Sequence, residues 1–253
     1  MENIKCEIDG GILVITLAHG KANAIGWKMV EELTGAVNQA VADSAIRGVV
    51  LASASPRFFS AGFDVAEVFG YDRPKMHEFF GNFIDLYEGL NRLPKPVVAA
   101  ISGHAYAGGA VLGLTADYRV MAEGDYGFAL NEINLGVAIP LGFIRMAIDA
   151  VGHRNASEIV LTGKSISPEQ ALEMGLAAAV VKPILLLDRA LEMARDLGSR
   201  PAGAFAKIKT GLRTLAGSGP GTTDRQELDH FLDGWFSPDA EERKQALIQS
   251  LKR

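Results

Sequence analysis

Two short stretches of this sequence place glycine where an apolar strand turns into a helix. The first is FFSAGFD, Phe58 to Asp64, and the second lies within ISGHAYAGGAVLGLTADYR, Ile101 to Arg119. Backbone amides at a helix N-terminus lack partners within the helix and carry partial positive charge, and glycine lets a ligand approach them closely. Two such turns facing one another would supply two donors to one substrate oxygen, with each donor stabilising a developing charge by about 3–4 kcal/mol. One turn alone is more typical of close packing, whereas the pair favours an oxyanion hole.

Each turn needs a strand before it and a helix after it. Continuous apolar runs, fit for burial on both sides, precede the turns at residues 48–52 and 97–101. Repeated units of this kind predict an α/β superhelix of stacked turns rather than a doubly wound sheet. The turns match neither GxGxxG nor GxxxxGK[ST], so they are not phosphate loops of those kinds.

The remaining pattern predicts a hairpin at the start of the chain and helices at its end. We divide the chain into a core of residues 1–195 and a C-terminal helical segment of residues 196–253. Ser167-Pro168-Glu169-Gln170 is typical of a capped helix start, and residues 217–221 are a glycine-rich break. Further strands are expected at 5–8, 12–17, 118–121, 126–129 and 178–181, and helices from residue 27 and at 64–93, 140–150 and 155–161.

Composition narrows the classes of partner. The 253 residues carry a formal net charge of −5 without a basic cluster, which argues against nucleic acid or an anionic membrane surface. The charge-free run at 96–116 contains four glycines and fits a buried strand, turn and helix better than a membrane span. A single cysteine, Cys6, and a start without a signal-peptide pattern predict a cytoplasmic protein. The five histidines lack metal-binding spacing, and a GxSxG motif is absent, so we expect neither a metal nor an esterase triad.

An ordered set of motifs resembles the enoyl-CoA hydratase/isomerase (crotonase) family. The set comprises FFSAGFD, ISGHAYAGGAVL, the DYRV strand, FALNEINLGVAIP and GHRNASEIVLTGKSISPEQALEMGL, and the resemblance runs over nearly the whole chain. Within the family, the order AGGAVLGLTADYR, LNEINLG, FSPD is most similar to mitochondrial-type 3,2-enoyl-CoA isomerases. The resemblance implies a crotonase-like (Clp protease-like) superhelix of ββα units. It also implies that the C-terminal helices are used to form a homotrimer or a dimer of trimers.

The same resemblance implies an acyl-CoA thioester as substrate, with coenzyme A as part of it and no separate cofactor. The backbone amides of Phe63 and Gly108 would hold the thioester carbonyl. Lys209 occupies a position where members often place a base near the CoA phosphates, although Lys207 remains an alternative. The other residues implied to bind CoA or the acyl group are Lys21, Ala22, Ala24, Ala61, Asp64, Val65, Tyr106, Val111 and Leu135.

Val111 marks a departure from the hydratases of the family. Those enzymes carry one glutamate three residues after the oxyanion glycine and a second in the LNEINLG region, and the pair activates water. Here the first position is Val111, whereas the second is kept as Glu132. One carboxylate suits a single base that takes a proton from C2 of a 3-enoyl-CoA and returns it at C4. Such a base should be partly desolvated, with a raised pKa, in an apolar setting that we expect Val111 to complete from the opposite side.

Three interpretations of function follow. The first is an isomerase of 3-enoyl-CoA thioesters, the second a hydratase or another crotonase reaction, and the third a non-catalytic acyl-CoA-binding protein. The segment 69–93 would shape the acyl pocket, and Phe231, Trp235 and Phe236 would pack on the core or close that pocket. Elsewhere, Asp117 and Arg119 are expected to form a structural ion pair, and His104 to be a hydrogen-bonded structural residue.

Overall fold

The structure is a computed structural model that describes residues 2–216 and 227–251; the glycine-rich break predicted at 217–221 lies outside these residues. Within them, the strands form two sheets. The larger sheet has the order β1-β2-β3-β5-β7-β9, and it is parallel except for the β1–β2 hairpin. The smaller, parallel sheet has the order β4-β6-β8. The larger sheet comprises β1 (Ile4–Asp9), β2 (Ile12–Leu17), β3 (Gly48–Ser53), β5 (Val97–Ile101), β7 (Tyr118–Ala122) and β9 (Ala179–Val181).

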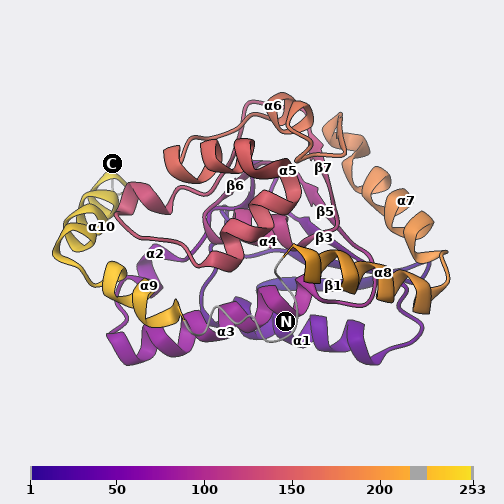
Figure 1. Cartoon of the computed structure of the whole chain (residues 1–253), viewed down its shortest axis with the longest axis horizontal. Helices are drawn as coiled ribbons and strands as arrows, with labels where there is room; N and C mark the ends of the chain where they lie inside the picture. Colours follow the sequence, from indigo (N-terminus) through magenta and orange to yellow (C-terminus); the bar gives the residue numbers. More distant parts are fainter. Residues whose placement is uncertain (1, 217–226, 252–253) are drawn as a thin grey trace.

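The predicted superhelix of ββα units is confirmed by the way the chain alternates between the two sheets. Each unit runs from a strand of the larger sheet to a strand of the smaller sheet and then into a helix (Figure 1). The units are β3, β4 (Phe58–Ser60) and α2 (Val65–Val68); β5, β6 (His104–Tyr106) and α4 (Gly108–Thr115); and β7, β8 (Phe128–Ala129) and η1 (Glu132–Leu135). The repeat therefore brings the ends of β4, β6 and β8, and the helix starts that follow them, to one region.

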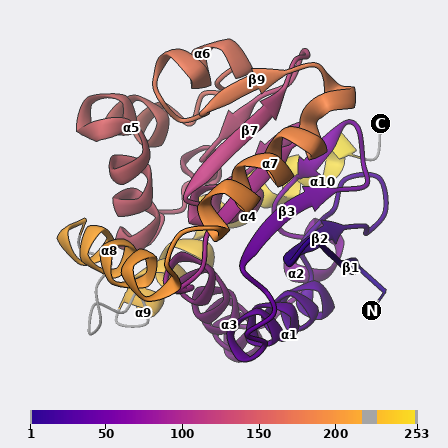
Figure 2. The same ribbon diagram turned by 90° about the vertical axis from the view of Figure 1, so that its right-hand side faces the viewer.

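The larger sheet is buried on both faces, which explains why its parallel strands are continuous apolar runs. One set of alternate residues, including Val50, Val98 and Val120, packs against α7 (Leu186–Gly198), which crosses the sheet in Figure 2. The other set, including Val49 and Val97, packs into the main core with the remaining helices. Among these helices are α1 (Trp27–Ala42), α3 (Arg73–Asn91), α5 (Leu141–Thr162) and α6 (Pro168–Glu173).

The C-terminal helices lie at two places on the molecule. After η2 (Pro183–Leu185) and α7, helix α8 (Ala202–Leu215) lies on the right in Figure 1. Helices α9 (Leu228–Trp235) and α10 (Pro238–Leu251) lie at the opposite end, beside α2 and α3. No helix in the described ranges is long and apolar enough to cross a membrane.

One helix prediction needs adjustment. The predicted helix at 64–93 is divided into α2 and α3, with the Asp72 side chain capping the second by accepting a hydrogen bond from the amide of Lys75 at 2.9 Å. The two helices predicted at 140–150 and 155–161 are the two halves of α5, which meet at a kink where Gly152 adopts the non-helical angles φ 73° and ψ 161°. At α6, the predicted helix start is confirmed, since Ser167 and Gln170 form a reciprocal capping box.

Candidate active site

The two glycine turns are in contact. A Cβ atom placed on Gly62 would lie 2.9 Å from the carbonyl oxygen of Tyr106 and 3.4 Å from the amide nitrogen of Gly108. A Cβ atom on Gly108 would in turn lie 3.2 Å from the ring of Phe63. Beside it, Gly109 packs so closely on β4 that a Cβ atom would lie 2.3 Å from the carbonyl oxygen of Ser60. The glycines therefore allow the start of α4 to rest directly on the first turn.

The amides of Phe63 and Gly108 are free donors at the contact between the turns. Phe63 sits in a parallel bridge with Ile25, in which Ile25 donates to Gly62 and Asp64 donates to Ile25. The Phe63 N–H takes no part in that bridge, and the Gly108 N–H is the first in its helix. Neither amide has a hydrogen-bond partner among the described residues.

Ala107 holds the second turn in an unusual conformation. Its φ of 48° and ψ of −122° lie outside the regions that residues with a Cβ atom normally adopt. Backbone strain of this kind costs about 1–3 kcal/mol and tends to occur at functional sites. The strained residue directly precedes Gly108, so it fixes the direction in which the Gly108 N–H points.

Asn23 positions the loop beside the first turn, and the sequence did not single it out. Its buried side chain donates to the Oγ of Ser53 at 2.8 Å and to the carbonyl of Phe59 at 3.1 Å, while the Ser60 hydroxyl donates to the backbone carbonyl of Asn23. Asn23 also has a positive φ of 47°, which asparagine tolerates better than most residues. The available signal was an asparagine inside a short polar loop, which is common in turns.

Glu132 is the first residue of η1, which follows β8, so the third unit brings its carboxyl group to the same region. The residue is partly exposed, but its Oε2 atom is buried and has no hydrogen-bond partner among the described residues. Burial raises the pKa of Glu132 from 4.5 to about 7. A carboxyl group with this pKa can both accept and return a proton near neutral pH.

The raised pKa makes the stability of the protein depend on pH. Between about 4.5 and about 7, the folded state holds a proton on Glu132 that the unfolded chain has lost, so stability falls as the pH rises through this range. We expect Glu132→Gln to exceed the wild type in unfolding free energy by about 1–3 kcal/mol at pH 8 and to match it near pH 4. Urea unfolding at both values measures this difference, and an equal difference at both values would contradict the assignment.

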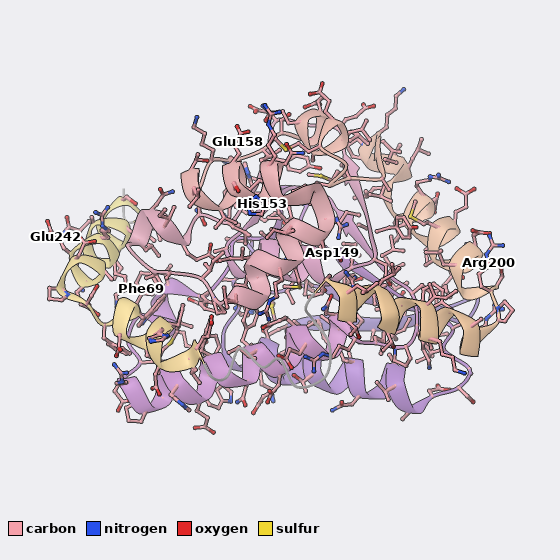
Figure 3. All side chains as sticks on the ribbon, in the orientation of Figure 1. Phe69, Asp149, His153, Glu158, Arg200 and Glu242 are labelled. Atoms are coloured by element: carbon pink, nitrogen blue, oxygen red, sulfur yellow. The ribbon has the colours of Figure 1, made fainter. Side chains whose placement is uncertain are left out.

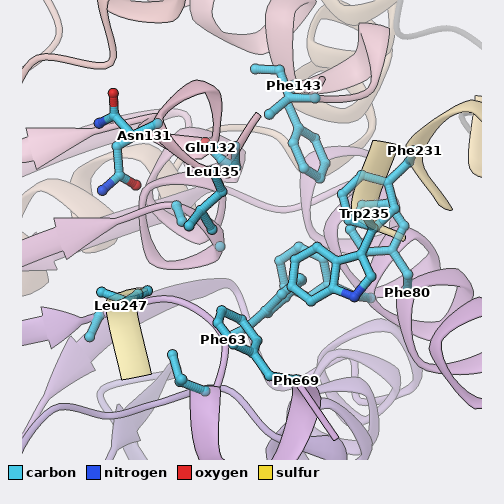
Figure 4. Close-up of a pocket in the computed structure, with 17 residues that line it drawn as sticks. Phe63, Phe69, Phe80, Asn131, Glu132, Leu135, Phe143, Phe231, Trp235 and Leu247 are labelled. Carbon is cyan, nitrogen blue, oxygen red and sulfur yellow. The ribbon is translucent and has the colours of Figure 1, made fainter. Parts of the chain in front are cut away.

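An apolar cavity of about 340 Å³ joins Glu132 to both turns. Figure 4 shows Glu132 and Leu135 on one side of this cavity and Phe143, Phe231 and Trp235 on another. The described lining contains Glu132 as its only carboxylate, with Asn131 and Asn134 as the other polar side chains. The lining residues are Ala61, Phe63, Val65, Phe69, Phe80, Phe83, Ala107, Gly108, Asn131, Glu132, Asn134, Leu135, Ile139, Phe143, Phe231, Trp235 and Leu247.

The predicted site residues fall into three groups in the structure. The loop that pairs with the first turn holds Lys21, Ala22 and Ala24, where the carbonyl of Ala22 accepts from the amide of Ala61. Asp64, Tyr106, Val111 and Lys209 do not belong to the cavity lining. The residues that do line the cavity are Ala61, Phe63, Val65, Gly108, Glu132 and Leu135.

Val111 is fully buried in the core, and Leu135, Ile139 and Phe143 are among the apolar residues that line the cavity. The expectation that Val111 completes the apolar setting of Glu132 from the opposite side stays a prediction.

Two other side chains near the turns have structural roles. Asp64 caps α2, because its Oδ1 accepts from the amides of Ala66 and Glu67. The Tyr106 hydroxyl lies 2.7 Å from His104 Nδ1, which also accepts from the amide of Gly127. The expected structural role of His104 is thus confirmed, whereas Tyr106 makes this contact outside the cavity.

Lys209 is buried in an ion pair, which does not fit the predicted contact with CoA phosphates. Its ammonium lies 2.7 Å from Asp117 and donates to the carbonyl of Lys95 at 3.0 Å. Asp117 also pairs with Arg213, which reaches Asp149 on α5 (labelled in Figure 3). The expected pair of Asp117 with Arg119 is therefore replaced by pairs with α8. Arg119 itself donates to the carbonyls that end α4 and precede Ala177, namely those of Gly113, Ala116 and Leu176.

We expect Lys209→Met to destabilise the fold rather than weaken CoA binding. The variant leaves Asp117 buried with Arg213 as its remaining charged partner, which should cost about 2–3 kcal/mol because breaking a buried pair strands a charge. Exposed Lys207 on the same helix provides the matched control, and Lys207→Met should leave stability unchanged. Urea unfolding measures the loss of stability, and acyl-CoA titration measures the affinity for CoA. If Lys209→Met lowers the affinity for acyl-CoA and leaves the stability unchanged, Lys209 binds the substrate instead.

The geometry of the site suits the stabilisation of an oxyanion next to a single carboxyl base. Two free amides, one carboxyl group of raised pKa and an apolar cavity meet where the three ββα units end. The described residues contain no cluster of histidine, cysteine, aspartate and glutamate that could hold a metal ion.

The chain is similar to known proteins in sequence and in fold. The profile of the enoyl-CoA hydratase/isomerase family matches residues 7–238, so the chain belongs to that family. It is 35% identical over 179 residues to mitochondrial enoyl-CoA delta isomerase 1 of Mus musculus, a match that covers 70% of this chain but only 62% of the mouse protein. It is also 34% identical over 215 residues to carnitinyl-CoA dehydratase of Escherichia coli K12, covering 85% and 82% of the two chains.

Solved structures show the same overall similarity. The crystal structure of human mitochondrial delta3-delta2-enoyl-CoA isomerase superposes with a TM-score of 0.93 at 26% identity, covering 99% of this chain and 98% of that one. An enoyl-CoA hydratase from Mycobacterium avium subsp. paratuberculosis gives a TM-score of 0.85 at 23% identity, over 97% and 98% of the chains, which supports the fold alone.

Proposed function

We propose that this protein moves the double bond of a 3-enoyl-CoA thioester to position 2. The observation that carries the proposal is Glu132, the only carboxylate in the described cavity lining, with its pKa raised to about 7 beside two free amides. A hydratase of this family would need a second carboxylate at position 111, where this chain has valine.

The reaction needs one base and one oxyanion hole. The amides of Phe63 and Gly108 hold the thioester carbonyl oxygen, which acidifies the protons on C2. Glu132 takes a proton from C2, and the electron pair moves into the carbonyl to form an enolate stabilised by both amides. The double bond between C3 and C4 then shifts to C2 and C3 as the protonated Glu132 returns the proton to C4. The product is conjugated with the thioester, and the carboxylate is regenerated.

The CoA portion is proposed to lie along the loop beside the first turn. Lys21 is exposed there and can meet a phosphate, and the backbone at Ala22 and Ala24 can meet the adenine. Asp64 and Val65 lie just beyond the turn, at the start of α2. Lys207, which is exposed, is a better candidate than buried Lys209 for a second phosphate contact.

The direct test is the absorbance of the conjugated thioester after adding 3-decenoyl-CoA. Turnover to 2-decenoyl-CoA, with little addition of water to 2-decenoyl-CoA in a parallel assay, supports the isomerase. Absence of any 3-enoyl-CoA turnover by folded protein overturns it.

Hydration or dehydration of an acyl-CoA is the second candidate, favoured by the 34% identity to a carnitinyl-CoA dehydratase. Mass spectrometry of the hydrated thioester detects this activity, and water addition faster than isomerisation would make it the main function. The third candidate, acyl-CoA binding without chemistry, requires tight binding and no turnover in both assays.

We also infer that the protein forms a homotrimer or a dimer of trimers. The supporting observation is an apolar stripe on α8, where Ile208, Leu212 and Leu215 are 65%, 61% and 88% exposed. Analytical ultracentrifugation separates these assemblies from a monomer. The cytoplasmic location expected from the sequence remains a prediction.

A further inference from the structure

Stacked aromatic rings from separate helices form one wall of the cavity. Phe80 of α3 and Phe231 of α9 lie face to face, with ring centroids 3.7 Å apart and planes within 7° of each other. Carbon atoms in contact are about 3.5–4.0 Å apart, so no chain atom can pass between these rings. Phe231 also stacks on Trp235, with centroids 5.7 Å apart (Figure 4).

This aromatic wall is held by further contacts to Trp235. The buried ammonium of Lys244, on α10, lies 4.8 Å from the centre of the Trp235 ring and pairs with Glu241. Phe69, which is labelled beside α9 in Figure 3, packs edge-on against Trp235 at 5.3 Å. A cation–π contact removed from water is worth about 2 kcal/mol, so Trp235 resists displacement by a longer substrate.

Phe143 of α5 extends this aromatic wall (Figure 4). Its ring packs nearly perpendicular to Phe83 and at 69° to Phe80, with centroids 6.2 and 6.3 Å apart. Phe80, Phe83 and Phe143 are each at most 2% exposed, so a longer chain cannot leave the cavity between them without moving a core side chain. Interiors of this density yield little to added volume.

The volume of the cavity limits the length of the acyl chain that it can hold. An apolar cavity of roughly 150 Å³ holds one benzene ring, so 340 Å³ holds about twice as many carbon atoms, or roughly twelve. We propose that the stack of Phe80, Phe231 and Trp235 limits the substrate to acyl groups of medium length, up to about twelve carbons, and excludes long-chain acyl groups. This inference rests on the proposed function, because it takes the cavity beside Glu132 as the acyl site.

The first test is a chain-length series with 3-hexenoyl-, 3-decenoyl- and 3-hexadecenoyl-CoA. We expect the wild type to prefer the decenoyl over the hexadecenoyl substrate by about tenfold or more in kcat/KM, since pocket discrimination of this size is worth a few kcal/mol. Phe231→Ala opens the stack and should bring the two values within about threefold of one another. Equal turnover of both substrates by the wild type overturns the proposal.

Two further variants keep the test decisive if Phe231→Ala folds poorly. Ile139→Trp fills the cavity, and we expect it to lower decenoyl turnover relative to hexenoyl turnover. Phe205→Ala, on α8 and outside the cavity lining, is the matched control and should leave the chain-length ratios unchanged. A ratio that changes as much in Phe205→Ala as in Phe231→Ala contradicts a limit set by the stack.

Calorimetry with saturated decanoyl- and hexadecanoyl-CoA separates this inference from the proposed function. Selective binding of the decanoyl ligand without any isomerisation would retain the length limit and reject the isomerase. Isomerisation of every chain length with equal affinity would retain the isomerase and reject the limit.

Discussion

Replacing Glu132 by glutamine should abolish most of the isomerisation of 3-decenoyl-CoA while leaving acyl-CoA binding intact. Glutamine keeps the shape of the side chain but cannot take the C2 proton, and general base catalysis contributes about 10²–10⁴-fold to a rate. The loss should appear in kcat rather than in the dissociation constant of a saturated acyl-CoA, because the oxyanion amides and the cavity are unchanged. Stopped-flow absorbance and calorimetry measure the two quantities.

The pH profile makes this result specific to the base. Because the pKa of Glu132 is about 7, wild-type kcat/KM should rise with pH through about 7 and then level off as the carboxylate forms. The small residual rate of Glu132→Gln should lack this rise. Glu158→Gln is the matched control, because Glu158 is exposed on α5 (Figure 3) and should retain both the rate and the profile. Residual activity above about a tenth of the wild type would assign the base elsewhere.

The sequence was most informative where local chemistry determines the structure. The two Ala-Gly turns, the buried strands before them and the capped helix start at Ser167 all depend on residues close together in the chain, and each is confirmed. The repeat of strand, turn and helix predicted a superhelix of stacked turns, and the family resemblance added the ββα units; the division of the strands into two sheets was not predicted.

Contacts between residues distant in the chain were harder to predict from the sequence. Asp117 has an arginine two positions away, yet it pairs with Lys209, 92 residues along the chain. Charge pattern alone could not select this partner, because the packing of α8 on the core decides which ammonium reaches the carboxylate. The buried orientation of Val111 likewise depends on where α4 runs after its first turn.

The aromatic stack beside the cavity is also a contact between residues that lie far apart in the sequence. The segment 69–93, which contains Phe80, was expected to shape the acyl pocket, and Phe231 was expected to pack on the core or close that pocket, but the sequence did not pair the two rings. Their face-to-face contact arises because α9 returns to α3 (Figure 1). A C-terminal segment expected for assembly thereby also forms part of the substrate cavity, through Phe231, Trp235 and Leu247.

Adding one methyl group at Gly109 should disable the oxyanion hole without touching the base. The new Cβ atom would lie 2.3 Å from the carbonyl oxygen of Ser60 and 2.8 Å from its Cβ, and neither a backbone carbonyl nor a Cβ can rotate away. The start of α4 must therefore move, and with it the neighbouring amide of Gly108. We expect Gly109→Ala to lose about 10²–10³-fold in kcat, the effect of losing one oxyanion donor, and about 1–3 kcal/mol of stability through overpacking.

A graded series of glycine variants supplies the controls. Gly35→Ala places a methyl group on the exposed side of α1 with nothing within 4 Å, and should not reduce activity. At Gly108 the methyl group would meet the ring of Phe63 at 3.2 Å and that of Phe83 at 3.4 Å, side chains that can yield slightly. Gly108→Ala should therefore lose less than about tenfold in kcat, because its N–H is retained.

Glu132→Gln and Gly109→Ala should also differ in which ligand each still binds. Glu132→Gln keeps both amides and should retain tight binding of a stable enolate analogue, because such analogues bind through interactions that strengthen in the transition state. Gly109→Ala should lose that affinity but keep the pH-dependent stability of Glu132, whose raised pKa comes from burial rather than from the amides. If folded Gly109→Ala binds the enolate analogue as tightly as the wild type, the Gly108 amide is not a donor to the substrate.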